Sequence, residues 1–171
     1  RAYEAYDTDY PQPGWAEQDP SDWWRAVCDS TRRLLTESGH AAQDIGVVSF
    51  SAQMMACLLV DARGAPLRKA IIWADQRAEA EAALLAERVG RERVYAISGH
   101  RCSPSYVAAK ILWVRTHQPE LLAATRCVLQ VKDYVAYRLT GAYATDYSDA
   151  SGSNAFDLRT RRWSEEILAA L

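Results

Sequence analysis

The stretch IGVVSF-SAQM, residues 45–54, joins a nearly all-apolar run to a short polar turn. The run at residues 45–50 is rich in β-branched side chains and carries no charge, which is typical of a strand buried on both faces of a sheet. In α/β sheets, the groups that follow the carboxyl end of a strand line the crevice where ligands bind. Residues 45–54 therefore predict an α/β fold and a candidate binding loop.

The elements on either side of this stretch extend the α/β pattern. An amphipathic helix is expected to begin after Asp19-Pro20, an N-cap followed by proline, and to end at Gly39. A hairpin turn is expected at residues 61–64, between two strands. Strands are expected at residues 1–6, 45–50, 56–60, 67–73 and 153–157. Helices are expected at residues 20–38, 76–89, 108–116, 119–125, 131–139 and 164–171. This order indicates a layered α/β domain.

Composition excludes several classes of protein. A length of 171 residues suits one domain, and a formal charge of −2 leaves no basic surface for nucleic acid or anionic lipid. The longest uninterrupted apolar stretch, residues 54–60, is far shorter than the roughly 20 residues that span a bilayer. The four cysteines lie far apart with no CxxC pair, which favours buried thiols in a reducing cytosol. No secretory leader opens the chain, so a cytoplasmic location is expected.

Several common catalytic signatures are missing from the sequence. It contains no GxxxxGK[ST] phosphate loop, no GxGxxG, no HExxH and no GxSxG. The three histidines, His40, His100 and His117, stand in unrelated contexts. A metal cluster or a Ser/His/Asp triad therefore has little support.

Three polar clusters fall where binding sites tend to form. Gln53, after the run at residues 45–50, offers a hydrogen-bond donor and an acceptor that suit a sugar hydroxyl, although it could equally be a polar turn residue. At residues 73–77 (WADQR), an aromatic face beside a carboxylate and a guanidinium suits a polyol, but Asp75 is also a good helix N-cap. Residues 145–152 (TDYSDASG) form either a ligand-contacting segment or a solvated loop.

Five motifs in order resemble the FGGY family of carbohydrate kinases, and within it the xylulokinase branch. Residues 14–20 with Trp23-Trp24 resemble the family's "WxEQDP…WW", and residues 71–77 resemble its "ILWxDxR". Residues 110–114 are similar to "KLLWL". Residues 132–141 resemble "KDYxxxxLTG", and residues 145–152 resemble "TDxSDASG". The resemblance covers essentially the whole chain, and the ordered set is more specific than any one motif.

This resemblance implies an actin-like, ribonuclease-H-like fold, of which residues 1–171 are part of the N-terminal, sugar-binding domain, with a mixed sheet and flanking helices. It implies ATP-dependent phosphorylation of a ketose such as the pentulose xylulose, using Mg²⁺, in a protein that could be a homodimer. The family's "GIDxGT" hairpin is expected before residue 1, and its catalytic aspartate and most of the ATP and Mg²⁺ site beyond residue 171. The sugar-binding residues that the resemblance and the polar clusters indicate are Gln53, Met54, Met55, Trp73, Asp75, Arg77 and Asp149.

Two positions depart from the family pattern. Xylulokinases carry "GQMHG" with a sugar-contacting histidine where this chain has Met55, which forms no strong hydrogen bond. The loss of such a contact shifts substrate preference by about 1–3 kcal/mol, so another ketose or a polyol is an alternative substrate. Val107 stands where a small hydroxyl residue or proline is expected, a minor packing change. A non-catalytic sugar-binding module is a further alternative, because both ends of the chain look cut.

Overall fold

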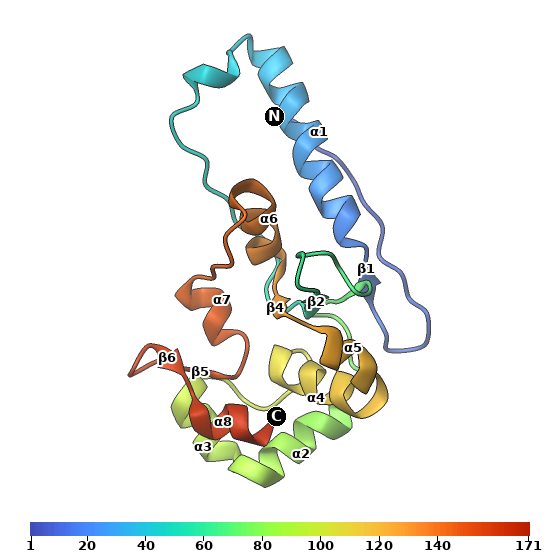
Figure 1. Ribbon diagram of the computed structural model, residues 1–171, viewed down its shortest axis with the longest axis vertical. Coiled ribbons are helices and arrows are strands. Elements are labelled where there is room, and N and C mark those ends of the chain that lie inside the picture. The colour runs from blue at the N-terminus through green and yellow to red at the C-terminus, as the bar shows by residue number, and fades with distance from the viewer.

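The computed structural model describes all residues 1–171. Helix α1 (Pro20–Ser38) projects from the rest of the molecule, while α2, α3, α4, α5 and α8 gather at the opposite end (Figure 1). The Asp19 side chain accepts a hydrogen bond from the Ser21 N–H at 2.8 Å, and Gly39 ends the helix in the left-handed conformation that glycine adopts without strain. Both predicted ends of this helix are confirmed.

Four short strands form the centre of the molecule. They are β1 (Glu17–Gln18), β2 (Leu58–Val60), β3 (Ala70–Ile71) and β4 (Cys127–Leu129). Strand β1 pairs with β3 and β2 pairs with β4, and a bridge between Cys57 and Ile71 joins the two pairs. A third pair consists of β5 (Phe156–Asp157) and β6 (Arg162–Trp163). Every pairing is antiparallel, so the expected mixed sheet does not form within residues 1–171.

The strand predicted at residues 45–50 is wrong for this structure. These residues form no ladder and lie largely in solvent, with Val47 85% and Val48 67% exposed. A buried strand needs partners for its N–H and C=O groups, and no segment within residues 1–171 pairs its backbone with this one. The strand predicted at residues 1–6 is absent for the same reason, since the nearest pairing is a single bridge between Asp9 and Glu17.

The remaining elements follow the predicted order. The helices are α2 (Glu79–Val89), α3 (Arg91–Ser98), α4 (Val107–His117), α5 (Pro119–Ala124), α6 (Val131–Thr140), α7 (Tyr147–Ser151) and α8 (Glu165–Ala170), with a short 3-10 turn at Ala42–Asp44. Helices α3 and α7 had not been expected. The predicted hairpin turn at residues 61–64 is present, with Asp61 Oδ1 accepting from the N–H groups of Arg63 and Ala65.

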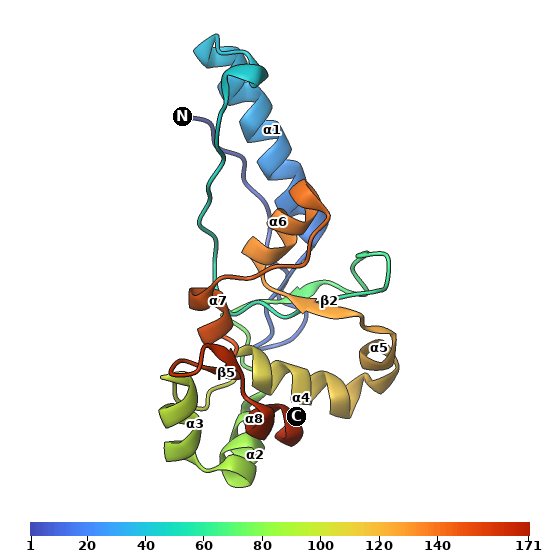
Figure 2. The same ribbon diagram turned by 60° about the vertical axis from the view of Figure 1, so that its left-hand side comes forward.

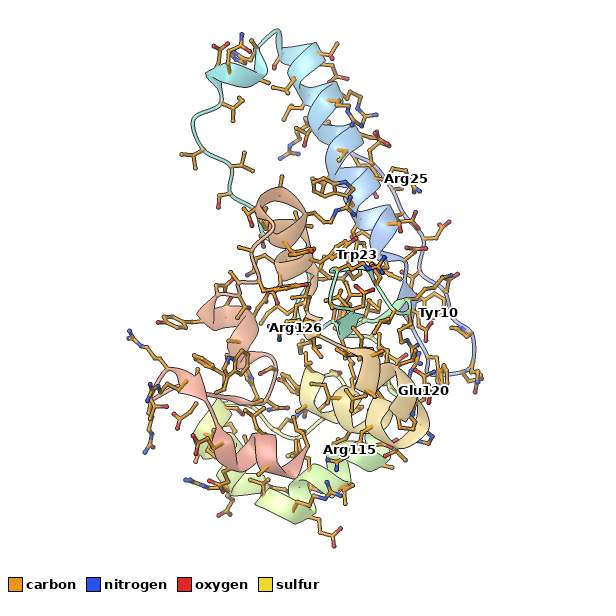
Figure 3. The ribbon with its side chains drawn as sticks, viewed as in Figure 1. Tyr10, Trp23, Arg25, Arg115, Glu120 and Arg126 are labelled. Atoms are coloured by element: carbon orange, nitrogen blue, oxygen red, sulfur yellow. The ribbon has the colours of Figure 1, made fainter.

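Strand β2 divides the core into two layers because alternate side chains point to opposite faces. Leu58 and Val60 pack with Trp23 of α1 and Tyr134 of α6, whereas Leu59 packs with Trp113 of α4. Figure 2 shows α1 and α6 on one side of β2 and α4 on the other. Figure 3 labels Trp23 at the base of α1, where its ring meets that of Tyr134 edge to face at 6.2 Å.

The far half of α1 contacts the N-terminal segment, where Arg33 pairs with Glu4 and donates to the Tyr3 carbonyl. Of the apolar face expected on this helix, Trp24, Val27, Cys28 and Leu35 are partly buried, whereas Thr31 and Leu34 are exposed. All four cysteines are free thiols, and only Cys57 is fully buried. None of the helices is long and apolar enough to cross a membrane.

Candidate functional site

The loop Gln53–Met55 connects the extended segment after α1 to strand β2. The Gln53 amide donates to Gln18 Oε1 at 2.6 Å, and the same oxygen accepts from the Trp23 indole at 2.9 Å. Gln18 is buried in β1, so it fixes the carboxamide of Gln53 relative to the sheet. The Oε1 atom of Gln53 has no protein partner and remains available as an acceptor.

Met55 has a left-handed backbone, with φ 64°, although it is not a glycine. This conformation costs a non-glycine residue of the order of 1 kcal/mol. The Met55 N–H donates to Gln130 Oε1 at 2.5 Å, and the Met55 carbonyl accepts from Lys110 Nζ at 2.6 Å. Hydrogen bonds to the side chains of Gln130 and Lys110 therefore hold the backbone of Met55 in place.

Helix α7 brings the segment at residues 145–152 against this loop. A β-carbon added at Gly152 would lie 3.2 Å from Met54 Cε and 3.5 Å from Met55 Cγ, so a glycine permits the close approach. The Gln130 side chain also donates to the Asp149 carbonyl. The first and third polar clusters of the sequence are therefore neighbours.

Asp149 is 1% exposed, and neither of its carboxylate oxygens has a hydrogen-bond partner. Its nearest cation is Lys132, 3.5 Å from Oδ2, which makes a closer ion pair with Asp146. Burial raises the pKa of the Asp149 carboxyl, because removal from water penalises the charged form. Buried carboxylates are normally paired or hydrogen-bonded, and Asp149 has only the ion pair with Lys132 at 3.5 Å, so its oxygens retain hydrogen-bond acceptor capacity.

In the second polar cluster, residues 73–77, the charged side chains bond to other groups of the protein. Asp75 accepts from the Ala16 N–H at 2.5 Å and from the Arg77 N–H at 2.9 Å, and it pairs with the Arg77 guanidinium at 2.7 Å. Arg77 also pairs with Glu17 at 2.7 Å, and its guanidinium carbon lies 3.6 Å from the centroid of the Trp15 ring. Both Asp75 and Arg77 have completely buried side chains. This network ties the start of the 73–77 segment to β1.

Trp73 is the part of this cluster that solvent can reach, with 51% of its surface exposed. The alternative role of Asp75 as a helix N-cap is wrong, because α2 begins at Glu79 after Ala78 and has no side-chain cap. The structure thus brings Met54, Met55 and the backbone of Asp149 together around Gln130 and Gly152, while the Gln53 side chain contacts Gln18. It buries Asp75 and Arg77 in an internal ion pair, and whether they contact a sugar stays a prediction.

Sequence reasoning missed Lys110, Gln130 and Gln18, which position the loop. Lys110 lies within the motif at residues 110–114, and a lysine on an otherwise apolar helix was the available signal. Gln18 lies within the motif at residues 14–20, whereas Gln130 carries no comparable signal. His100 was set aside as isolated, yet its ring nitrogens contact Ser151 Oγ at 2.8 Å and the Tyr106 hydroxyl at 3.2 Å. Burial lowers the pKa of His100.

A separate cavity lies apart from this site. It measures about 530 Å³, is mainly apolar and lies between α4, β4 and α8. Gln130 reaches its wall, but none of Gln53, Met55, Trp73 and Asp149 does. Outside this cavity, Gln53, Met54 and Met55 are partly exposed and Trp73 is exposed, whereas Asp75 and Asp149 are buried.

Comparison with known proteins assigns the chain to a family. The model of the N-terminal domain of the FGGY family of carbohydrate kinases matches residues 1–171. The chain belongs to the FGGY family. It is 41% identical over 160 residues to a xylulose kinase of Escherichia coli (strain K12), an alignment that covers 94% of this chain and 32% of the relative.

Solved structures of FGGY kinases share the fold. A structure described as a xyloylose kinase from Brucella ovis has a TM-score of 0.92 at 36% identity, over 98% of this chain and 35% of that one. A xylulose kinase from Rhodospirillum rubrum has a TM-score of 0.89 at 30% identity, over 96% and 34% of the two chains. The α/β fold is thus that of the FGGY carbohydrate kinases, which have the actin-like ATPase fold. The chain spans about a third of the length of these relatives.

Proposed function

We propose that this chain forms the sugar-binding part of an ATP-dependent carbohydrate kinase that phosphorylates a hydroxyl of a ketose, a pentulose such as D-xylulose. The observation that carries the proposal is the convergence of the Gln53–Met55 loop with Asp149, whose buried carboxylate lacks any hydrogen-bond partner. Membership of the FGGY family and the similarity to xylulose kinases support the same substrate class.

The residues of this chain would bind and orient the sugar. The free Oε1 of Gln53 and the carboxylate of Asp149 accept hydrogen bonds from hydroxyl groups, and the exposed ring of Trp73 offers a face to C–H groups. Asp75 and Arg77 would act indirectly, by fixing the backbone segment that carries Trp73. Phosphoryl transfer depends mainly on positioning and charge stabilisation, so a fixed sugar hydroxyl is a direct contribution to the rate.

ATP and Mg²⁺ belong to the proposal through the family. Bound Mg²⁺ neutralises charge on the transferred phosphoryl group. Residues 1–171 contain no group of three or more His, Cys, Asp or Glu side chains placed to hold a metal ion. No residue of this chain is therefore assigned to the metal, and the aspartate that accepts the hydroxyl proton is proposed to lie beyond residue 171. We further propose a cytoplasmic enzyme whose partner is a small sugar, not nucleic acid or a membrane.

A coupled assay of ADP release tests the proposal on the full-length protein, with a panel of ketoses and polyols. We expect sugar-dependent turnover, with the highest kcat/KM on a ketose. Turnover that no sugar in the panel stimulates would refute the kinase function and favour a non-catalytic sugar-binding module.

A second candidate substrate, another ketose or a polyol, is favoured by Met55, which stands where xylulokinases carry a sugar-contacting histidine. Under this hypothesis, Met55→His raises kcat/KM for D-xylulose, because the imidazole supplies a hydrogen bond that the thioether cannot. Met55→Leu is the matched control, since it also removes the sulfur but adds no polar group. An unchanged or lower rate for Met55→His counts against this interpretation of the position.

A further inference from the structure

Both backbone polar groups of Met55 are bound by side chains that lie far away in the sequence. Gln130 accepts from the N–H across 75 residues, and Lys110 donates to the carbonyl across 55 residues. Met55 has φ 64°, a conformation that persists in a non-glycine residue only when its surroundings hold it there. The conformation of the loop is therefore set from outside the loop.

Burial of the charged Lys110 side chain in α4 costs free energy. Its side chain is 0% exposed, and the carboxylate that acts on its charge, Asp75, is paired with Arg77. Its ammonium group donates to two carbonyls, those of Met55 and Ser105, each at 2.6 Å. Burial lowers its pKa to about 8, which reflects the cost of the charge in this environment. An apolar side chain would fill the same space at less cost but could not hold a carbonyl group.

Gln130 connects two parts of the candidate site with one carboxamide. Its oxygen accepts from the Met55 N–H at 2.5 Å, and its nitrogen donates to the carbonyl of Asp149. Gln130 precedes α6 and is itself buried, so its side chain has little freedom to move. The separation between Met55 and Asp149 is thereby fixed through a single side chain.

We propose that Lys110 and Gln130 are positioning residues for sugar binding: together they hold the Met55 peptide and set the placement of the Gln53–Met55 loop against Asp149. The inference rests on the proposed kinase function and adds to it two residues that do not themselves contact the sugar. Since both act on one residue, their effects on sugar binding are coupled. Their effects on the nucleotide are expected to be small.

The test uses Lys110→Met and Gln130→Met in the full-length protein, with Lys69→Met as a control. Methionine has a similar length and forms no strong hydrogen bond, and Lys69 is an exposed lysine paired with Asp9. We expect each of the first two variants to lower kcat/KM for D-xylulose about 10- to 100-fold, because misplaced binding groups reduce productive positioning. The KM for the sugar should rise while the KM for ATP stays near the unsubstituted value, and Lys69→Met should change neither.

A double-mutant cycle separates positioning from general stabilisation. If both residues act through Met55, the double variant loses little more kcat/KM than the worse single variant, whereas independent effects multiply. Thermal unfolding of each variant, and calorimetric titration with D-xylulose, show whether the variants are folded and how far sugar affinity falls. Should Lys110→Met fail to fold, Gln130→Met still tests the sugar-specific rise in KM.

The outcomes separate this inference from the kinase function. Folded variants with unchanged sugar KM, or with equal losses for sugar and ATP, overturn the inference and leave the kinase proposal intact. An unsubstituted protein without turnover on any sugar overturns both.

Discussion

Two carboxylates of this domain are almost completely buried, and their surroundings differ sharply. Asp75 accepts two backbone N–H groups and pairs with Arg77, which in turn stacks on Trp15 and pairs with Glu17. Asp149 has no hydrogen-bond partner for either oxygen and a lysine 3.5 Å away that is engaged elsewhere. These contacts support a structural role for Asp75, whose contact with a sugar stays a prediction, whereas Asp149 has acceptor capacity that a ligand could use.

The comparison teaches that a carboxylate and a cation close together in the sequence can satisfy each other within the protein. In the sequence, Asp75 and Arg77 beside Trp73 resembled a polyol-binding set. In the structure, their polar side-chain atoms bond to other groups of the protein, except for Arg77 Nη1. The unused groups lie instead in the 145–152 segment, whose composition alone favoured a solvated loop. Buried oxygens without a hydrogen-bond partner distinguish Asp149 from Asp75, and only a structure shows this property.

The largest effect is expected when the Asp75 network is broken. Asp75→Ala leaves the buried Arg77 guanidinium with Glu17 as its remaining carboxylate partner and removes the acceptor of the Ala16 N–H. We expect the free energy of unfolding to fall by about 3 kcal/mol or more, as for other buried pairs that lose one member. Urea unfolding measures it. A loss below about 1 kcal/mol would contradict the structural role assigned to Asp75.

The next largest effect is a pH dependence of the free energy of unfolding that arises from Lys110. Its folded-state pKa of about 8 lies below the unfolded value of 10.5, so between these values the unfolded chain binds more protons and stability rises with pH. The rise amounts to at most about 3 kcal/mol, and Lys110→Met should abolish it. The charged or titratable groups that face Lys110 are Cys57, Asp75 and Arg77. Burial raises the pKa of Cys57 to about 11, so it stays neutral through this window.

Unfolding by urea at a series of pH values from 7 to 10.5 measures this slope. The comparison of the unsubstituted protein with Lys110→Met isolates the lysine, since all other groups are shared. An identical slope in both proteins would show that the depressed pKa of Lys110 has no effect on stability.

A smaller effect of opposite sign is expected at Asp149. Its folded-state pKa is raised, so the folded state binds the extra proton and stability falls as pH rises from the unfolded value through the folded one. At neutral pH, Asp149→Asn removes a buried charge that has no hydrogen bond and only a 3.5 Å ion pair with Lys132, so stability should stay unchanged or rise by up to about 1 kcal/mol. The same substitution should lower kcat/KM for the sugar. A clear loss of stability with unchanged kcat/KM would place Asp149 with Asp75 as an architectural residue.

The smallest effect is expected for an exposed ion pair. Asp9 and Lys69 lie 2.6 Å apart with both side chains about half exposed. Water and salt screen such a pair, so Asp9→Ala should leave the unfolding midpoint unchanged within error. Measured beside Asp75→Ala, it shows that burial rather than the presence of an ion pair determines the cost. A loss comparable to that of Asp75→Ala would contradict this explanation.

Local chemistry in the sequence determined much of the fold. The Asp19-Pro20 start and Gly39 end of α1 and the Gly141 end of α6 follow from capping and from glycine's tolerance of positive φ. The hairpin turn at residues 61–64 follows from the Asp61 side chain. The ordered motifs also predicted the FGGY family, which the match over residues 1–171 confirms.

Residues 45–50 mark the limit of this approach. Their composition predicted a buried strand, but a strand exists only when a neighbouring segment binds its backbone groups, and none within residues 1–171 does so. The sequence pattern indicates only which secondary structure a segment prefers. Whether a partner is present is decided by the arrangement of the whole chain.

In the candidate site, too, some features follow from the sequence and others only from the tertiary structure. The sequence by itself determined that Gln53–Met55, residues 73–77 and residues 145–152 carry the polar groups, because side-chain chemistry is local. Only the tertiary structure decided that Gln130 joins Met55 to Asp149, that Lys110 holds a carbonyl 55 residues away, and that Asp75 and Arg77 satisfy each other. Those roles depend on contacts between distant segments and on exclusion of water, and neither property is encoded at any single position.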